Sequence, residues 1–360
     1  MDRPGSDTPG VEQRRARAAV AEVERLCRSA TDATTLHRSV AAAVATAVPF
    51  DRWCAMSFDP STALPTGGFH AEGLPMALVP RLLELEYGDE DDVGRLADVA
   101  RAERPVARLS DVTGRDPARS PRFRDVLRPA GLPHELRVVH REGRTPWGAM
   151  IAFRGTDAPD FTAAEAALLG TLGPRVAAAL RRVQLLARVD EATGNEPGVV
   201  LVEVSEGRVA VLTGSAAALQ RLAEVDDGTV DGLPFAVTSL ARSAHGRRAT
   251  ARCRLRTRTG RWLTLHAERL SGSTVSLVVE PSRPADIAAL LTDAYRLSER
   301  EAEVVGLVVR GHSNAEIARA LWLSPYTVAD HVKNVFEKTG VRSRGELTGR
   351  LFFDHYLPRL

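Results

Sequence analysis

The densest run of side chains that could bind a ligand is a series of arginines in the third quarter of the chain. No acidic residue interrupts Arg242, Arg247, Arg248, Arg252, Arg254, Arg256, Arg258 and Arg261. On an extended strand, alternate members of this run fall on one face, where guanidinium groups could bind nucleic-acid phosphate or another anionic ligand. The pattern also fits a solvated outer sheet face whose charges protect a strand edge, and we favour this second interpretation.

A second run, Glu84 to Asp92, offers carboxylates for a cation. It lacks the spacing and the terminal glutamate of a calcium loop, so a solvated loop is the better interpretation. The three cysteines, Cys27, Cys54 and Cys253, are too few and too scattered for a disulfide framework or a zinc finger. The sequence therefore predicts no metal site and no cofactor.

Catalytic signatures are also missing from the sequence. We find no nucleophile elbow and no glycine loop that would cradle a phosphate, so no catalytic residue is predicted and an enzyme is not expected. The formal net charge of +2 over 360 residues argues against a nucleic-acid coat protein or a polybasic membrane protein. Met1 to Gly10 has no apolar core of the signal-peptide type, and no run of about 18 apolar residues follows. We expect a cytoplasmic protein without a membrane partner.

Serine marks the start of each of four short helices expected between Leu297 and Phe353. Three starts combine an N-cap hydroxyl with a carboxylate three residues later, the capping-box pattern: Ser298/Glu301, Ser313/Glu316 and Ser343/Glu346. The fourth is Ser324 followed by proline, which suits the first helical position. The expected second and third helices, Asn314 to Leu321 and Pro325 to Thr339, are separated by only three residues. This spacing is typical of a helix-turn-helix, whose second helix enters the major groove of DNA.

The same stretch resembles the LuxR/NarL/FixJ type of four-helix DNA-binding domain found in bacterial transcription regulators. The matching residues are Leu297-Ser298-Glu299-Arg300-Glu301, Gly311-His312-Ser313-Asn314-Ala315-Glu316-Ile317-Ala318, Leu323-Ser324, Thr327-Val328, His331, Lys338 and Val341-Arg342-Ser343-Arg344-Gly345-Glu346-Leu347. The resemblance implies an all-α domain over residues 297–360, with double-stranded DNA, RNA polymerase and a second copy of the chain as partners.

The resemblance also assigns base reading to the third helix. The family usually has lysine where this chain has Ala329, so the recognised sequence should differ from the family norm. Asp330 could accept a hydrogen bond from a cytosine amino group, and Lys333 could donate to guanine. The predicted DNA-binding residues are Asn314, Ser324, Tyr326, Thr327, Ala329, Asp330, Lys333, Asn334, Lys338, Arg342 and Arg344. Basic and acidic residues nearly cancel across residues 293–360, so affinity per monomer should be modest and a dimer is expected.

The front of the chain resembles a GAF sensor domain of actinobacterial regulators over residues 16–188, after an N-terminus of residues 1–15 that we expect to be disordered. The resemblance rests on Pro146 to Ala149 and Asp160 to Glu165, and on the order of helices, strand, strand pair and closing helix. Five residues could line a small-molecule pocket or form plain core, and we favour core: Trp53, Met56, Phe58, Trp147 and Ile151.

Residues 198–281 read as two strands, helices and three strands, an order that resembles a PAS-type α/β module. A hinge and connecting helix are expected over residues 282–296. The sequence thus predicts a multidomain α+β protein, with a GAF-like sensor, a PAS-like module and a C-terminal LuxR-type domain. The expected function is a dimeric transcription regulator whose front domains respond to an unidentified ligand or partner. The alternative is an adaptor that uses its helix-turn-helix to bind a protein such as RNA polymerase.

Overall fold

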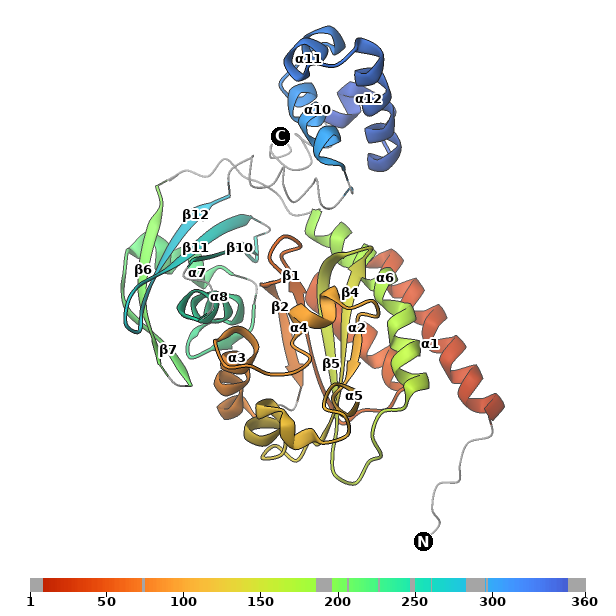
Figure 1. Ribbon diagram of the computed structural model, residues 1–360, viewed down its shortest axis with the longest axis vertical. Coiled ribbons are helices and arrows are strands. Elements are labelled where there is room, and N and C mark those ends of the chain that lie inside the picture. Colours follow the sequence, from red (N-terminus) through yellow and green to blue (C-terminus); the bar gives the residue numbers. More distant parts are fainter. Residues whose placement is uncertain are drawn as a thin grey trace.

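The chain has a mixed α/β architecture with two five-stranded sheets followed by a group of helices (Figure 1). The computed structural model describes residues 9–72, 75–185, 196–205, 207–225, 227–246, 250–259, 261–282, 295 and 297–348. Within these ranges no helix combines the length and the apolar character needed to cross a membrane. The expected fold class, α/β units followed by a helical C-terminal domain, is confirmed.

The first sheet is antiparallel and has the strand order β2-β1-β5-β4-β3. Its strands are β1 (Arg52–Phe58), β2 (Pro65–Glu72), β3 (Val106–Arg108), β4 (His134–Glu142) and β5 (Thr145–Arg154). The expected strand pair is β4 and β5, which meet at a tight turn where Gly143 has φ of 59°. Glycine adopts that backbone conformation without a steric penalty.

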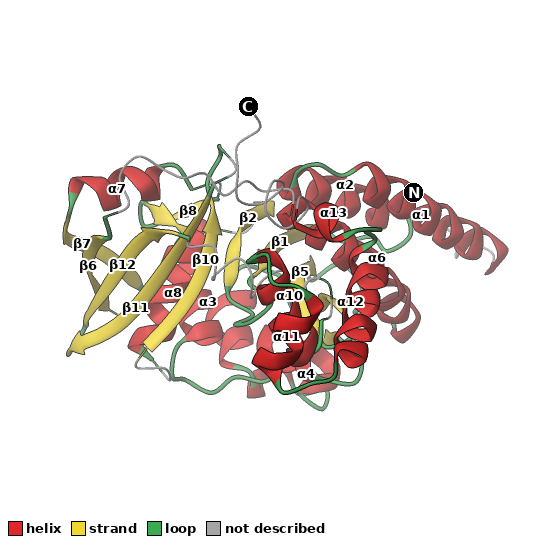
Figure 2. Cartoon of the chain, turned by 90° about the horizontal axis from the view of Figure 1, so that it is seen from above, coloured by secondary structure: helices red, strands yellow, loops and turns green. Residues whose placement is uncertain are grey.

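Long helices cover one face of this sheet and short ones cover the other (Figures 1 and 2). The long helices are α1 (Pro9–Ser29), α2 (Ala33–Ala45) and α6 (Ala163–Leu185). Val23, Val40 and Val176, one from each, lie in the same hydrophobic core. The short helices include α3 (Val79–Tyr87), α4 (Leu96–Arg101) and α5 (Leu109–Val112). Because α1 begins at Pro9, it includes part of the segment that we expected to be disordered.

The second sheet repeats the same antiparallel order, β7-β6-β12-β11-β10. Its strands are β6 (Gly198–Ser205), β7 (Arg208–Gly214), β10 (Thr250–Arg256), β11 (Trp262–Ser271) and β12 (Thr274–Pro281). Helix α7 (Ala216–Ala223) and the short strands β8 (Thr229–Val230) and β9 (Leu233–Pro234) follow β7. We call the first sheet with its helices the first unit, and the second sheet with α7 and α8 (Phe235–His245) the second unit. Helix α8 is buried from Phe235 to Ala244 because it packs between the second sheet and the first unit (Figure 1).

The C-terminal helices are α10 (Glu299–Val309), α11 (Asn314–Leu321), α12 (Pro325–Thr339) and α13 (Arg344–Thr348). Capping boxes at Ser298 and Ser313 form as expected. The third box does not close. The Glu346 carboxylate accepts a hydrogen bond from the N–H of Arg342 instead of that of Ser343. Most of the expected hinge, and residues 349–360, lie outside the described residues.

Candidate DNA-binding surface and sensor cavity

A small cavity of about 30 Å³ lies in the first unit, between the sheet and α3. Its walls are mostly apolar, and they come from strands β1, β2, β4 and β5, from α3 and α4, and from α8 of the second unit. The lining residues are Cys54, Met56, Phe69, Val79, Leu82, Leu83, Glu86, Tyr87, Leu96, Arg137, Ile151 and Phe235. The volume is sufficient for one or two water molecules, so a larger ligand requires a lining side chain to move.

Two of the five expected pocket residues, Met56 and Ile151, line this cavity. Trp53 lies in a separate cluster with Ala41 and Met150 on the other face of the sheet, because successive side chains on a strand point to opposite faces. Phe58 is buried in the same core as Met56 without lining the cavity, and Trp147 packs in the core formed by the long helices.

The second unit supplies part of the cavity wall through stacked aromatic rings. The ring of Phe235, at the start of α8, stacks on Phe69 of β2 with 3.8 Å between centroids and 3° between planes. The Asp227 carboxylate joins the same elements, because it accepts hydrogen bonds from the N–H groups of Phe69 at 3.0 Å and Ala236 at 2.8 Å. Neither Phe69 nor Phe235 was expected from the sequence, since the two lie far apart along the chain.

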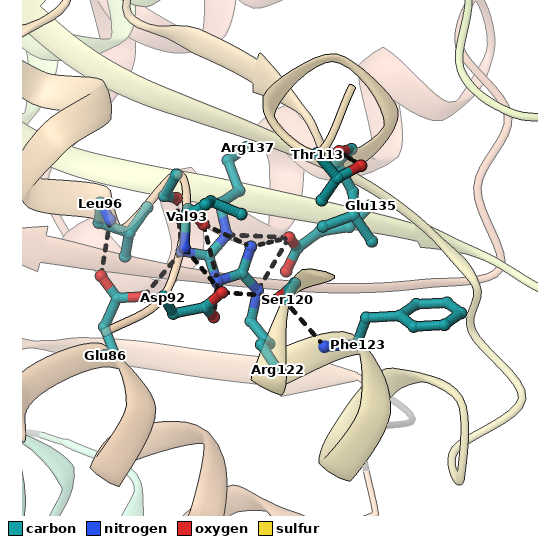
Figure 3. Close-up of polar contacts among 12 residues, drawn as sticks. Glu86, Asp92, Val93, Leu96, Thr113, Ser120, Arg122, Phe123, Glu135 and Arg137 are labelled. Carbon is teal, nitrogen blue, oxygen red and sulfur yellow. Dashed lines mark hydrogen bonds and ion pairs between the residues drawn. The ribbon is translucent and has the colours of Figure 1, made fainter. Parts of the chain in front are cut away.

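A buried network of ion pairs lies beside the cavity (Figure 3). Arg137 bonds to Glu86 at 2.7 Å and lies 3.1 Å from Glu135. Arg122 pairs with Asp92 at 2.5 Å and with Glu135 at 3.0 Å. Burial alone would raise the pKa of Glu135, but the two guanidinium groups outweigh it and lower that pKa. Glu86 and Arg137 also line the cavity, so this network fixes its polar wall.

The network corrects our interpretation of the acidic run as a solvated loop for Glu86 and Asp92, whereas Asp89, Glu90 and Asp91 are exposed as expected. Glu86 lies on α3, and the side chains of Glu86 and Asp92 are almost fully buried against arginines. The described residues contain no group of three or more metal-ligating side chains with the geometry of a metal site.

The arginine run is not a uniformly solvated sheet face, because Arg254 of β10 points at the first unit. Its Nη2 lies 2.6 Å from Oδ1 of Asp59, and its Nε lies 2.7 Å from Oδ2. Both side chains are almost fully buried. Arg254 therefore binds the carboxylate of another unit, and neither the anion-site interpretation nor the solvated-face interpretation holds for it.

Helices α11 and α12 form a tight helix-turn-helix. Trp322 ends α11 in the left-handed conformation, with φ of 56°, and Ser324 caps α12 through a hydrogen bond from the N–H of Thr327. Val328, Val332 and Val335 are buried. This apolar stripe holds α12 against α10 and α11 and determines which of its residues face outward.

The outward face of α12 contains five of the eleven residues expected to contact DNA. Tyr326, Ala329, Asp330, Lys333 and Asn334 are all exposed. They recur at the three- and four-residue spacing of one helical face. A helix with such a face after a short turn has the geometry to enter a major groove.

Comparison with known proteins agrees with this geometry. Residues 295–350 match the family model of the bacterial regulatory proteins, luxR family. These residues form a LuxR-family domain.

Two curated relatives each match a short part of the chain. The chain is 45% identical over 65 residues to the monoamine regulon transcriptional regulator of Klebsiella aerogenes, a match that covers 18% of this chain and 26% of the relative. It is 40% identical over 76 residues to the oxygen regulatory protein NreC of Staphylococcus aureus, covering 21% of this chain and 35% of the relative. The chain thus matches about a quarter to a third of each relative's length.

For the N-terminal region, the structural neighbours include GAF domains. One is the GAF domain/HD domain protein from Geobacter sulfurreducens, with 24% identity and a TM-score of 0.33, covering 43% of this chain and 96% of that one.

In the LuxR-type domain, three residues expected near phosphates are held by partners within the protein. The Arg344 guanidinium donates to the carbonyl of His312 at 2.6 Å and to the side chain of Asn314. Lys338 donates to the Glu301 carboxylate at 2.5 Å, which ties the end of α12 to the start of α10. Burial alone would raise the pKa of Glu301, but the bonds from Lys338 and Ser298 lower it.

The remaining expected residues lie at the ends of α12. The hydroxyls of Ser324 and Thr327 are 2.9 Å apart at its N-terminus, and Arg342 is exposed beyond its C-terminus. Trp322 was not among the predicted DNA-binding residues. It is 94% exposed in the turn between α11 and α12, and Tyr326, in the first turn of α12, is 78% exposed. An aromatic residue in the turn between two helices was the feature of the sequence that could have predicted the exposure of Trp322.

Proposed function

We propose that the chain is a DNA-binding transcription regulator that acts as a dimer in the cytoplasm. The outward face of α12, from Tyr326 to Asn334, carries this proposal. It supplies one acceptor at Asp330 and one donor at Lys333 for base edges in the major groove. Basic and acidic residues nearly cancel across residues 293–360, so one copy should bind the phosphate backbone weakly. High affinity therefore requires two copies on a two-fold-related site.

We propose further that the two front units act as a sensor of a small ligand or protein partner. Phe235 from α8 forms part of the wall of the cavity between β1, β5 and α3. A ligand larger than water would have to displace a wall residue, so its binding would favour one packing of the two units over another. That shift would change how the DNA-binding domains pair or are released.

The direct test is fluorescence anisotropy of the full chain on DNA from upstream of its own gene, against scrambled DNA, over a salt series. Specific binding that weakens with added salt is expected. An unbiased selection from random DNA that returns no enriched sequence would contradict the proposal.

Matched variants locate the binding surface. Lys333→Ala should weaken specific binding by about 1–3 kcal/mol and relax base preference where the lysine contacts guanine. Arg101→Ala removes the same charge from an exposed position on α4, outside the LuxR-type domain, and should leave binding unchanged. Equal losses in both variants would exclude a specific role for Lys333.

A second candidate function is an adaptor that contacts a protein such as RNA polymerase through the helix-turn-helix. The exposed rings of Trp322 and Tyr326 favour it, because aromatic side chains are enriched at protein–protein contacts. If the chain is such an adaptor, it should bind RNA polymerase, and it should show no preference for any DNA sequence in the same salt series.

A further inference from the structure

Exposed apolar side chains gather at one edge of the second sheet. Leu212 of β7 is 54% exposed and its neighbour Val211 is 41% exposed. Val199 of β6 and Leu219 of α7 add two more exposed apolar side chains. They lie close to the same strand end, because the Val199 carbonyl accepts from the N–H of Ser215 at 2.9 Å and Leu219 packs beside Gly214. Single exposed apolar residues are ordinary, but a cluster at a strand edge indicates a contact surface.

The two edges of this sheet differ in how they are protected. The β10 edge has arginines at alternate positions, and Arg254 there is buried against Asp59 of the first unit. The β7 edge lies on the side away from the first unit in both views (Figures 1 and 2). No charged residue occurs from Val209 to Leu219. Edge strands are usually blunted by charge, proline or a bulge. β7 has no proline, its one charge is Arg208 at its first position, and a bulge at Leu212 interrupts its pairing with β6.

The backbone of β7 can accept another strand. Among the described residues β7 pairs only with β6. The N–H of Val209 is occupied by Asp231 at 3.1 Å, so the open edge runs from Ala210 to Gly214. Leu212 is the extra residue of a β-bulge, since Val211 pairs with Val202 and Thr213 with Leu201. A bulge can redirect a side chain away from its own sheet.

We propose that residues 210–214 of β7 pair antiparallel with the same residues of a second copy, about a two-fold axis at Leu212. This inference rests on the dimer in the proposed function and identifies its surface. A segment that pairs with itself must not place like charges opposite each other. All five residues are uncharged, and Arg208, the one charged residue of β7, lies outside the pairing. The two copies of Leu212 cover each other, and the two sheets become one continuous sheet.

Light scattering of the full chain over a concentration series tests this arrangement. The wild type should be a dimer, and Leu212→Lys should raise the dimer dissociation constant about tenfold or more, because it places two like charges together at the axis. Leu270→Lys is the matched control. Leu270 is 56% exposed at the end of β11 in the same sheet, and its replacement should leave the dissociation constant unchanged.

Cross-linking tests the register. Directly opposed residues of an antiparallel pair have Cα atoms about 4.5–5.5 Å apart, within the range that a disulfide spans. Leu212→Cys should therefore form a covalent dimer under mild oxidation and Leu270→Cys should not. The native cysteines, Cys27, Cys54 and Cys253, are all buried and should contribute no cross-link.

Anisotropy on DNA in parallel separates this inference from the proposed function. A wild-type dimer that binds DNA specifically, but is unaffected by Leu212→Lys and is not cross-linked by Leu212→Cys, overturns the β7 surface and leaves the regulator intact. A monomeric wild type overturns the surface as well. If Leu212→Lys still dimerises but no longer binds a different protein that pairs a strand with β7, the β7 edge serves that partner. This result also overturns the proposed dimer surface.

Discussion

Asp59 and Arg254 form a buried ion pair that joins the two sheets of the chain. Asp59 follows β1 and Arg254 lies on β10, 195 positions further along the sequence. Two side-chain hydrogen bonds of 2.6 and 2.7 Å connect them, and the Arg254 N–H donates a third to Asp59 at 3.2 Å. Burial of two charges is unfavourable unless such bonds satisfy them. The pair therefore favours one packing of the second unit against the first.

Arg254→Leu should destabilise the protein by about 3–5 kcal/mol, because it leaves the Asp59 carboxylate buried without its partner. The measurement is the free energy of unfolding from urea denaturation at neutral pH. Asp59→Asn combined with Arg254→Leu should recover part of the loss, since neither charge is then buried alone.

Arg269→Leu is the control for that experiment. Arg269 is exposed on β11 of the same sheet and donates to the carbonyl of His245 at 2.8 Å. Its loss should cost about 1 kcal/mol or less. If Arg254→Leu unfolded at the same urea concentration as Arg269→Leu, the Asp59 pair would have no special role in stability.

Stability should fall as the pH drops below about 6.5, because of His140. Burial, with a smaller effect from His37, lowers the pKa of His140 from 6.5 to about 3. The unfolded chain therefore takes up this proton first as the pH falls. The contribution of His140 is intact above pH 6.5 and declines toward pH 3, by up to about 1.4 kcal/mol per pH unit.

His140→Leu should remove this part of the pH dependence. Both ring nitrogens lack a hydrogen-bond partner within the described residues, so an apolar replacement should not reduce stability at pH 7. The test compares the free energy of unfolding at pH 5 and pH 7 in wild type and His140→Leu. An identical change between the two pH values in both proteins would contradict this role of His140.

Local signals made much of the fold predictable from the sequence. The boundaries of α11 and α12 follow from Ser313, Ser324 and Gly340, because caps are satisfied by residues within one turn. The strands of the second sheet follow from alternation between turns. The start of α1 did not follow, since the polar composition around Pro9 carries no sign that the helix packs on α2 and α6.

Contacts between distant segments were not predictable in the same way. The five expected pocket residues do not all lie on one face of the first sheet. Trp53 and Met56 of β1, for example, are an odd number of positions apart and therefore point to opposite faces. The roles of Arg254 and Phe235 depend on how the second unit packs against the first, which no local pattern encodes. One signal was available: the run from Phe235 to Ala244 is apolar or small on nearly all sides, which is typical of a helix buried between two layers.

The Lys338–Glu301 pair should stabilise the LuxR-type domain. Glu301→Gln and Lys338→Met should each reduce hydrogen-exchange protection in α10 and α12 by about 1 kcal/mol, a modest value because Lys338 is partly exposed. The pair's contribution is present above pH 4.5 and is lost as the pH falls through the lowered pKa of Glu301.

The same two variants distinguish a structural lysine from one that binds DNA. If Lys338 binds phosphate, Lys338→Met lowers the salt dependence of DNA binding by about one counterion and Glu301→Gln does not. Since its ammonium group is engaged with Glu301 in the structure, we expect equal changes in protection and an unchanged salt slope in both variants.

Trp322→Gly should stabilise the helix-turn-helix. Trp322 adopts φ of 56°, and a left-handed backbone costs a residue other than glycine about 1–2 kcal/mol. The ring is 94% exposed, so its removal sacrifices little packing. Hydrogen exchange of α11 and α12 amides in the full chain should therefore become slower. Tyr326→Gly is the contrast, since Tyr326 lies in the first turn of α12, where glycine lowers helix stability. Faster exchange in Trp322→Gly would show that the ring makes stabilising contacts that outweigh its strained backbone.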